Sequence, residues 1–471
     1  MQKYKRRLKM KRILTTIALC ALLAAGADAQ NDKWFDKNGK ILPQYLDEET
    51  GLLADEYLPD AHEFTSLDEA LAVPERVIKL NLSGKELTEF PPEVFMFPNI
   101  QVLDLQQNQI TEIPSRISEI PTLQYLTLNS NEISKVSAEI GTLKNLLMLN
   151  LEQNKLTALP DEISGLENLL DLALGENVLE HLPKQISGMT RLSNLAVPKN
   201  RLKALPSDIG HLMELQCIDI SDNQIVELPP SVGQLQTLMI FDAHNNHIAT
   251  LPDEICKLSQ LPYLNLSNNG IKTLPKGFGK MKFLQMLDLS KNSIQALPSS
   301  IGEMKMMQDF NVSQNKLTSV PKTIVNWTFV SNISIAENKI SKLPEFGMMQ
   351  NLRELYIDYN DISSLPKSIS QLVSLEKFSA GGNKIEVLPA DFGKLENLQS
   401  LNLEKNSIGD LPKSMQRMQQ LQELNISNNA LTDFPPYFSA VSGLTLLDLS
   451  GNNFTEDKRN SLRSTYPNAK L

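Results

Sequence analysis

An asparagine recurs with a 23-residue period through most of this chain, and each one ends the frame LxLxxN, as in Leu103, Leu105 and Asn108. Other apolar residues take the place of leucine in some turns. One step, between Asn338 and Asn360, is a residue shorter. So regular a period predicts one array of stacked turns with a continuous core, rather than a series of separate domains. The sixteen asparagines of this ladder are Asn108, Asn131, Asn154, Asn177, Asn200, Asn223, Asn246, Asn269, Asn292, Asn315, Asn338, Asn360, Asn383, Asn406, Asn429 and Asn452.

The strand part of the repeat can be assigned in the turn from Leu149 to Asp171. Leu149 and Leu151 alternate with polar residues, which is the pattern of a short strand with one buried face. Asn154 follows on the same side. Its amide can satisfy backbone donors and acceptors of neighbouring turns that would otherwise be buried without partners.

The return part of each turn begins with a proline six residues after the ladder position. This holds in 15 of 16 internal turns, with Ser137 as the exception, and the fixed φ of proline favours a bend there. Apolar residues then follow at a spacing of three, as in Ile163, Leu166 and Leu169, which favours short 3₁₀ or irregular helical segments. A degenerate turn that ends at Lys85 precedes the ladder, so about 17 turns are expected.

These turns predict an α/β solenoid. The strands would stack at about 4.8 Å per turn in a parallel sheet, while the bulkier return segments need more room. The array must therefore curve. Its concave side is predicted to be the sheet and its convex side the short helical segments.

The consensus LPxxIxxLxxLxxLxLxxNxLxx, which covers residues 77–453, resembles the leucine-rich repeat family. The 23-residue form with LPxxI is similar to the subclass found in Ras-suppressor-like and scribble-like scaffolds and in many bacterial proteins. The resemblance implies a curved binding surface. It implies little else about function, because one fold can carry many binding sites.

The amino terminus has the pattern of an export signal. A basic stretch through Arg12 precedes an apolar run that starts at Ile13, and the small residue Ala29 suits signal peptidase, so cleavage is predicted before Gln30. The apolar run, about 13 residues long, is shorter than the ~20 residues that span a bilayer. Lipid attachment at Cys20 is the less favoured alternative, since leucine precedes it where a small residue is usual.

The charge of the chain argues against nucleic acid as a partner. The formal charge is −10. The segment before Gln30 carries seven basic side chains and one acidic side chain, a net +6, so its removal would leave −16. Such an acidic surface repels phosphate backbones and anionic membranes. No later apolar stretch is long enough to span a membrane.

The repeat boundaries divide the chain into four expected segments. They are a signal peptide at 1–29, an acidic leader with an amino-terminal cap at 30–76, the repeat solenoid at 77–453 and a carboxy-terminal cap at 454–471. A capping box that starts at Ser66 predicts a short helix in the first cap, and Thr455 is predicted to begin a helix in the second. Caps are expected because the end turns must cover an otherwise open core.

Two columns of apolar residues in neighbouring turns form the main predicted protein-binding surface. The first lies on the strands, six residues before the ladder asparagine, and consists of Ile240, Tyr263 and Met286. The second lies nine residues before it, where the chain enters the strand, and consists of Phe283, Met306 and Phe329. Stacking places these residues side by side, and contiguous exposed apolar surface is typical of interaction sites.

The turn of Asn360 carries a second candidate group. Tyr356, Asp358 and Tyr359 place tyrosine beside carboxylates, a combination that suits protein or glycan recognition.

His244 and His247, which flank a ladder asparagine near Asp242, are candidate metal ligands. Two imidazoles and a carboxylate could hold a divalent metal. Asp or Asn fills the position of Asp242 in most turns, however, so this carboxylate follows the repeat consensus. No metal site is therefore expected.

Some unusual residues occupy ordinary positions of the repeat. Trp327 stands where other turns have leucine, which predicts core packing. Cys256 stands where other turns have glycine or serine, on the side opposite to Cys217, so no disulfide is expected between them.

The sequence contains no Gly-rich phosphate loop, nucleophile elbow or HExxH motif, and only five histidines. The chain is predicted to be a non-catalytic binding protein without a cofactor, exported to the periplasm, the cell surface or the medium, that binds a protein ligand as a monomer. A glycan-binding adhesin is one alternative. An intracellular signalling scaffold is another, and it requires that the leader is retained.

Overall fold

The computed structural model describes residues 34–441 and 443–471. The predicted signal peptide, its cleavage site before Gln30 and Cys20 lie outside the described residues. The chain divides into two compact units, unit 1 ending at Ile225 and unit 2 beginning at Val226.

Unit 1 is built around a parallel sheet with one short strand per turn. Neighbouring strands pair one repeat apart, so that Leu126 lies opposite Leu149. The strands of this sheet are β1 (Glu63–Phe64), β2 (Lys79–Asn81), β3 (Val102–Asp104), β5 (Tyr125–Thr127), β7 (Met148–Asn150), β8 (Asp171–Ala173), β9 (Asn194–Ala196) and β10 (Cys217–Asp219). The 3₁₀ segments are η2 (Pro43–Tyr45), η3 (Leu58–Asp60), η4 (Pro74–Arg76), η5 (Pro92–Met96), η6 (Ser115–Glu119), η7 (Ala138–Thr142), η8 (Asp161–Gly165), η9 (Ile186–Gly188) and η10 (Ile209–His211).

Unit 2 repeats this arrangement. Its strands are β11 (Ile240–Asp242), β12 (Tyr263–Asn265), β13 (Met286–Asp288), β14 (Asp309–Asn311), β15 (Asn332–Ser334), β16 (Glu354–Tyr356), β17 (Lys377–Ser379), β18 (Ser400–Asn402), β19 (Glu423–Asn425) and β20 (Leu446–Asp448). The 3₁₀ segments are η11 (Pro230–Gln234), η12 (Asp253–Lys257), η13 (Phe278–Lys280), η14 (Ser299–Glu303), η15 (Lys322–Asn326), η16 (Phe346–Met348), η17 (Lys367–Gln371), η18 (Phe392–Lys394), η19 (Lys413–Arg417) and η20 (Pro436–Ala440).

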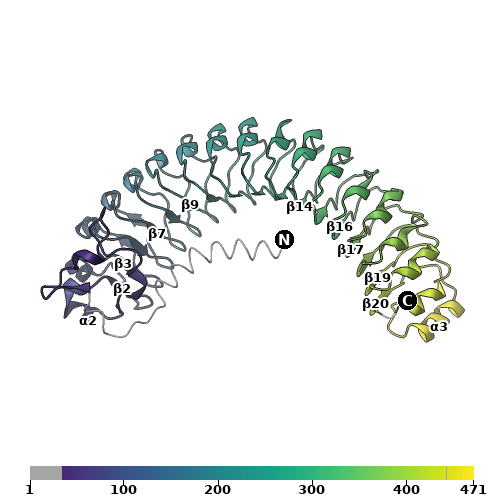
Figure 1. Cartoon of the computed structure of the whole chain (residues 1–471), viewed down its shortest axis with the longest axis horizontal. Helices are drawn as coiled ribbons and strands as arrows, with labels where there is room; N and C mark the ends of the chain where they lie inside the picture. Colours follow the sequence, from purple (N-terminus) through teal and green to yellow (C-terminus); the bar gives the residue numbers. More distant parts are fainter. Residues whose placement is uncertain (1–33, 442) are drawn as a thin grey trace. The chain divides into compact units, whose positions relative to one another are not determined.

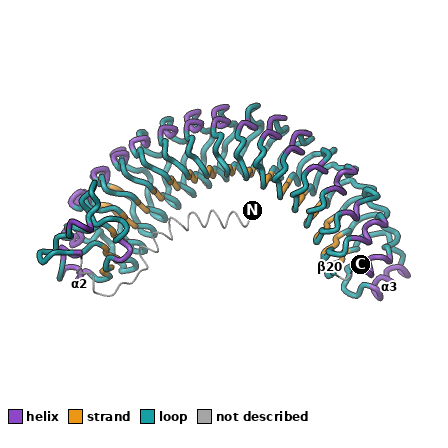
Figure 2. Tube along the Cα trace, viewed as in Figure 1, coloured by secondary structure: helices purple, strands orange, loops and turns teal. Residues whose placement is uncertain are grey.

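The predicted α/β solenoid is confirmed in each unit. Strands line one side of a unit and 3₁₀ segments the other (Figures 1 and 2). Leu149 and Leu151 point between these layers and are fully buried, because alternate strand residues face the same side. Apart from β1, the sheets in the described part of the two units contain one strand for each of the 17 predicted turns.

The ladder asparagines hold the turns together through their side-chain amides. In unit 1, Asn154 Oδ1 accepts a hydrogen bond of 2.9 Å from the backbone N–H of Ile133. Its Nδ2 donates to the carbonyls of Leu128 and Leu151, at 3.0 and 3.1 Å. One buried side chain therefore satisfies backbone groups of its own turn and of the preceding turn, as predicted.

Ser137, the exception to the proline rule, lies beside the two-stranded pair β4 (Glu112–Ile113) and β6 (Lys135–Val136). Its backbone N–H donates to the carbonyl of Ile113 at 3.2 Å. Proline has no N–H and could not make this bond. The exception therefore extends a short pairing on the return side of unit 1.

The shortened step leaves the sheet of unit 2 intact. β15 and β16 pair with Asn332 opposite Glu354, so the two strands stay in register although their separation along the chain is one position shorter than elsewhere. Asn360 Nδ2 still donates to the carbonyl of Ile335 at 3.0 Å. The missing residue is therefore absorbed outside the paired strands, between β15 and β16.

The amino-terminal segment packs against the first turns of unit 1. Trp34, Leu53 and Leu58 form a buried cluster with Ile78 and Val102. The short helix α2 (Leu67–Leu71) follows at the predicted place. The capping-box detail was wrong, because the side chain of Ser66 makes no capping hydrogen bond in α2.

Unit 2 ends with the helix α3 (Glu456–Thr465). Thr455 caps it, since the Thr455 side chain accepts a hydrogen bond from the backbone N–H of Lys458 at 3.3 Å. Leu462 is buried, so the apolar side of α3 covers the last turn.

Candidate functional site

The strand column predicted as exposed apolar surface is almost covered. Ile240, Tyr263 and Met286 lie side by side in β11, β12 and β13, but their exposed fractions are only 9%, 6% and 8%. The prediction of exposure was wrong because strands about 4.8 Å apart place each side chain between two neighbours. These residues form a packed row, so they offer little apolar surface to a partner.

The second column is accessible. Phe283 and Phe329 are 48% and 56% exposed. Met306, in the turn between them, is half-buried. They lie in successive turns just before β13, β14 and β15. We refer to Phe283, Met306 and Phe329 as the apolar edge.

Asparagine at this column position has a structural role that the sequence reasoning missed. Asn145 and Asn168 donate through Nδ2 to the carbonyls of Pro121 and Lys144, both at 2.8 Å. In unit 2, Asn351 and Asn397 make the same bond to the carbonyls of Thr328 and Val373, at 2.7 and 2.8 Å. The recurrence of asparagine nine residues before the ladder position was the available signal.

The side chains of the apolar edge cannot make the bond that asparagine makes at this position in other turns. Phenylalanine and methionine offer no N–H to the neighbouring carbonyl, and two of the three leave about half of their surface in water. Compared with the asparagine turns, each position lacks one hydrogen bond, which contributes about 0.5–1.5 kcal/mol. The stability of the fold therefore does not account for the apolar edge.

The predicted tyrosine group divides into separate contacts. Tyr356 lies on β16 and its hydroxyl donates to Glu354 at 3.0 Å, while Lys377 pairs with the same carboxylate at 3.1 Å. Burial, with the nearby Glu354, raises the pKa of Tyr356. Tyr356 is therefore held within its own strand, apart from Tyr359.

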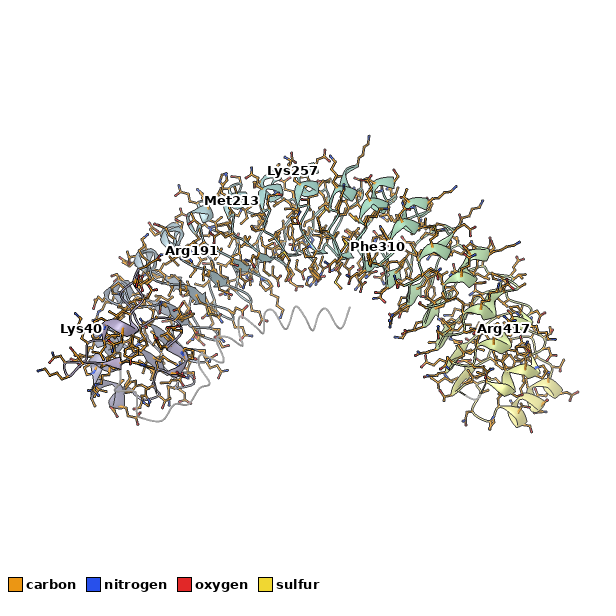
Figure 3. The ribbon with its side chains drawn as sticks, viewed as in Figure 1. Lys40, Arg191, Met213, Lys257, Phe310 and Arg417 are labelled. Atoms are coloured by element: carbon orange, nitrogen blue, oxygen red, sulfur yellow. The ribbon has the colours of Figure 1, made fainter. Side chains whose placement is uncertain are left out.

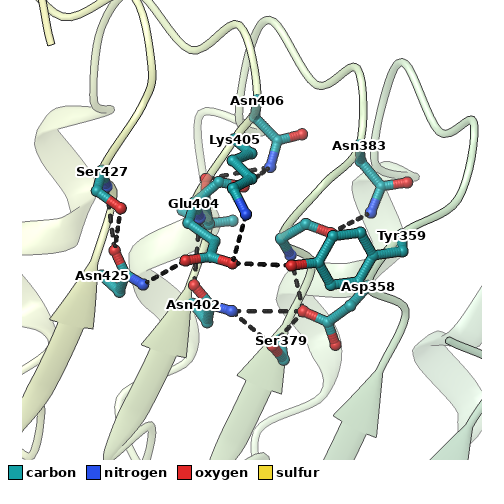
Figure 4. A network of polar contacts seen from close by, with 12 residues as sticks. Asp358, Tyr359, Ser379, Asn383, Asn402, Glu404, Lys405, Asn406, Asn425 and Ser427 are labelled. Carbon is teal, nitrogen blue, oxygen red and sulfur yellow. Dashed lines mark hydrogen bonds and ion pairs between the residues drawn. The ribbon is translucent and has the colours of Figure 1, made fainter. Parts of the chain in front are cut away.

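Asp358 joins a polar network that runs along successive turns of unit 2 (Figure 4). Its carboxylate accepts from the Ser379 hydroxyl and from the Gly381 N–H, the latter at 2.9 Å. Asn402 Nδ2 lies 3.4 Å from the same oxygen. Burial raises the pKa of Asp358, although these hydrogen bonds oppose the shift.

Tyr359 extends over the next turn and is 48% exposed. Its hydroxyl donates to Glu404 at 3.2 Å (Figure 4), and the Lys405 ammonium lies 5.7 Å from the ring centroid. A Cβ at Gly382 would lie 2.5 Å from the ring, so the ring needs glycine there. Gly382 also has a φ of +63°, which glycine adopts without strain.

Gly382 and Glu404 were not predicted as site residues from the sequence. Two adjacent glycines directly before Asn383, where other turns have polar residues, were the available signal. The contacts do not favour glycan binding over protein binding, because both tyrosine hydroxyls already donate to carboxylates. The glycan alternative stays a prediction.

The two histidines considered for metal do not converge. His244 Nδ1 lies 2.6 Å from an oxygen of Asp242, which is two residues away on the same turn, and His247 is exposed. Within residues 34–441 and 443–471 no group of three or more His, Cys, Asp or Glu side chains is placed to hold a metal ion.

Both cysteines beyond the leader are present as thiols. Cys256 is buried, as its position in a tight return segment predicts, and burial raises the pKa of its thiol. Among the described residues, no helix is long and apolar enough to cross a bilayer.

Comparison with protein-family models gives two matches. A model described as a leucine-rich repeat region matches residues 115–200, 245–362 and 337–464, and a second, described as leucine rich repeat, matches residues 75–133 and 213–271. A search of curated protein sequences returned no match.

Solved structures similar to this chain include a leucine-rich repeat protein of Leptospira interrogans, with 32% identity over 87% of this chain and 98% of that one, and a TM-score of 0.73. The plant peptide hormone receptor RGFR1, solved in complex with RGF2, has 25% identity over 84% and 77% of the two chains and a TM-score of 0.61. A TDR receptor has 28% identity over 75% and 64%, and a TM-score of 0.67.

Proposed function

The chain belongs to the leucine-rich repeat family, and from that premise we propose that it is an exported, non-catalytic binding protein that holds a protein ligand at the apolar edge. The observation that carries the proposal is a row of apolar side chains in three successive turns, the exposed Phe283 and Phe329 and the half-buried Met306, at a column position that is polar in most other turns. Exposed apolar patches that the fold does not need are typical of interaction sites. A similar receptor in complex with RGF2 supports a binding role.

The test restores the asparagine. The triple variant Phe283→Asn, Met306→Asn and Phe329→Asn should fold with a thermal midpoint no lower than wild type, because each new amide can donate to the neighbouring carbonyl, for about 0.5–1.5 kcal/mol each. The same variant should lose its partner. Capture is measured in intact cells with a photo-crosslinking residue at Gln260, which lies in the same column of the preceding turn.

The matched control carries Ser374→Asn and Gln420→Asn. These substitutions change the same column position in two turns where that position is polar. This control should capture the same protein as wild type. Equal capture by the triple variant would remove the apolar edge from consideration.

Export is supported by the leader, whose basic stretch, apolar run and small residues before Gln30 suit signal peptidase. The mass of the native protein should correspond to an amino terminus at Gln30. A lipid-modified Cys20 would keep export and add a membrane anchor. Retention of Met1 would instead favour an intracellular scaffold.

A further inference from the structure

We infer that the ligand segment at the apolar edge combines acidic with apolar side chains. This inference rests on the proposed function and adds the chemistry of the partner. It follows from the charges around the edge, which differ from those of the rest of the chain.

The turns that carry the apolar edge are basic. Residues 270–344 contain ten lysines and only four carboxylates, whereas the whole chain has a formal charge of −10. Clustered charge of one sign raises the local concentration of oppositely charged ligands and speeds their association. The basic stretch therefore selects for an acidic partner within an otherwise acidic protein.

Part of this charge lies directly beside the edge. Lys282 and Lys305 immediately precede Phe283 and Met306 and are exposed, and Lys280 ends η13. Lys257 ends η12 in the preceding turn, on the side of the 3₁₀ segments (Figure 3). Lysine stems can cover apolar surface while their ammonium groups stay in water, so both contact types are available to one ligand.

These lysines differ from a lysine at the equivalent position of unit 1. Lys144 precedes Asn145 as Lys282 precedes Phe283, but its ammonium pairs with Glu167 at 2.8 Å and donates to the Gly165 carbonyl at 2.7 Å. The ion pairs within the described part of unit 2 include neither Lys282 nor Lys305. These two ammonium groups are therefore not held in an ion pair, as that of Lys144 is.

The dimensions favour a short linear segment. Three successive turns at the strand spacing place the first and third edge residues about 10 Å apart. A few residues of an extended or helical peptide cover that distance. Carboxylates that flank two apolar anchors would meet the lysines while the anchors contact Phe283 and Phe329.

The experiment uses the mature chain and two short fluorescein-labelled peptides. One alternates glutamate with leucine and phenylalanine, and the other has lysine in place of every glutamate. The acidic peptide should bind at least about tenfold more tightly than the basic one in fluorescence anisotropy. Its affinity should fall as added salt shortens the screening length towards about 8 Å.

Charge reversal gives the sharper comparison. Lys282→Glu with Lys305→Glu should weaken the acidic peptide about tenfold or more and improve binding of the basic one. Lys144→Glu, at the equivalent position of unit 1, should change neither affinity. The triple asparagine variant should bind neither peptide, since the apolar anchors are absent.

Three results would overturn the inference. These are equal binding of both peptides, an unchanged preference after charge reversal, and binding of phosphatidylserine vesicles in place of the acidic peptide. If any of them occurs while the triple asparagine variant still loses its cellular crosslink, the proposed protein-binding function stands and only the acidic character of the partner is wrong. If the preference for the acidic peptide is absent and the triple asparagine variant keeps its cellular crosslink, both the inference and the proposed function are wrong.

Discussion

Asn292→Ala is expected to lower the free energy of unfolding of unit 2 by about 3–5 kcal/mol, because each buried backbone group that loses its partner costs about 1–3 kcal/mol. Asn292 Oδ1 accepts from the Ile271 N–H at 3.0 Å. Its Nδ2 donates to the carbonyls of Leu266 and Leu289 at 2.9 and 3.0 Å. Alanine can replace none of these bonds, and the small exposure of the site allows water to recover only part of the loss.

Urea denaturation followed by circular dichroism measures this effect, and hydrogen–deuterium exchange locates it. The Ile271 amide should exchange faster in the variant, since its acceptor has gone. Asn397→Ala is the matched control, because that asparagine makes one exposed bond, of 2.8 Å, to the Val373 carbonyl. Its loss should cost about 1 kcal/mol or less. Equal costs at the two sites would contradict the role assigned to the ladder.

The ladder and the strands could be predicted from the sequence because the same motif recurs sixteen times. Because the motif has so many copies, its positions can be assigned even in turns that depart from it. The inward position of leucine and asparagine follows from the alternation of strand residues. The shortened step before Asn360 could be located for the same reason. The register of β15 and β16 then shows where the missing residue was absorbed.

The candidate site was less predictable, since exposure depends on neighbours from other turns. Tyr263 lies on the outward face of its strand, as expected, but residues in β11 and β13 flank it and cover it. Phe283 is exposed because it lies where the chain enters the strand. The bond that asparagine makes at that position joins two turns, so it cannot be seen in one repeat alone.

Tyr359 illustrates the same limit for polar contacts. The sequence places it beside Asp358 and one residue before Asn360, but its hydroxyl bonds to Glu404, 45 residues away. Gly382 makes room for the ring, and this requirement depends on a backbone conformation with positive φ. Neither contact follows from residue type or spacing.

Trp327→Ala should destabilise unit 2 by about 3–5 kcal/mol, because a large side chain is removed from a core that can close only partly around the space. Trp327 is fully buried. Its indole N–H donates to the Ile301 carbonyl at 3.0 Å, and its ring meets the ring of Phe310 with centroids 5.0 Å apart. The variant therefore loses packing, an aromatic contact and a hydrogen bond.

Trp327→Leu separates these contributions, since leucine is the commonest residue at this position in the other turns. It should cost about 1–3 kcal/mol, because leucine fills part of the space but leaves the Ile301 carbonyl without its donor. Urea midpoints from circular dichroism measure both variants. Val387→Ala, at an exposed site, should change stability by less than about 0.5 kcal/mol.

Fluorescence gives these variants an internal reference. The chain has two tryptophans, so the emission left after substitution of Trp327 comes from Trp34, which is buried in unit 1. If the loss is confined to packing in unit 2, the emission maximum of Trp34 in the absence of urea should match that of the single variant that keeps Trp34 and carries Trp327→Phe. A red-shifted Trp34 would mean that the damage is not local. If the alanine variant is as stable as the leucine variant, Trp327 is not packed as described. This turn would then tolerate a cavity, which a close-packed core is not expected to do.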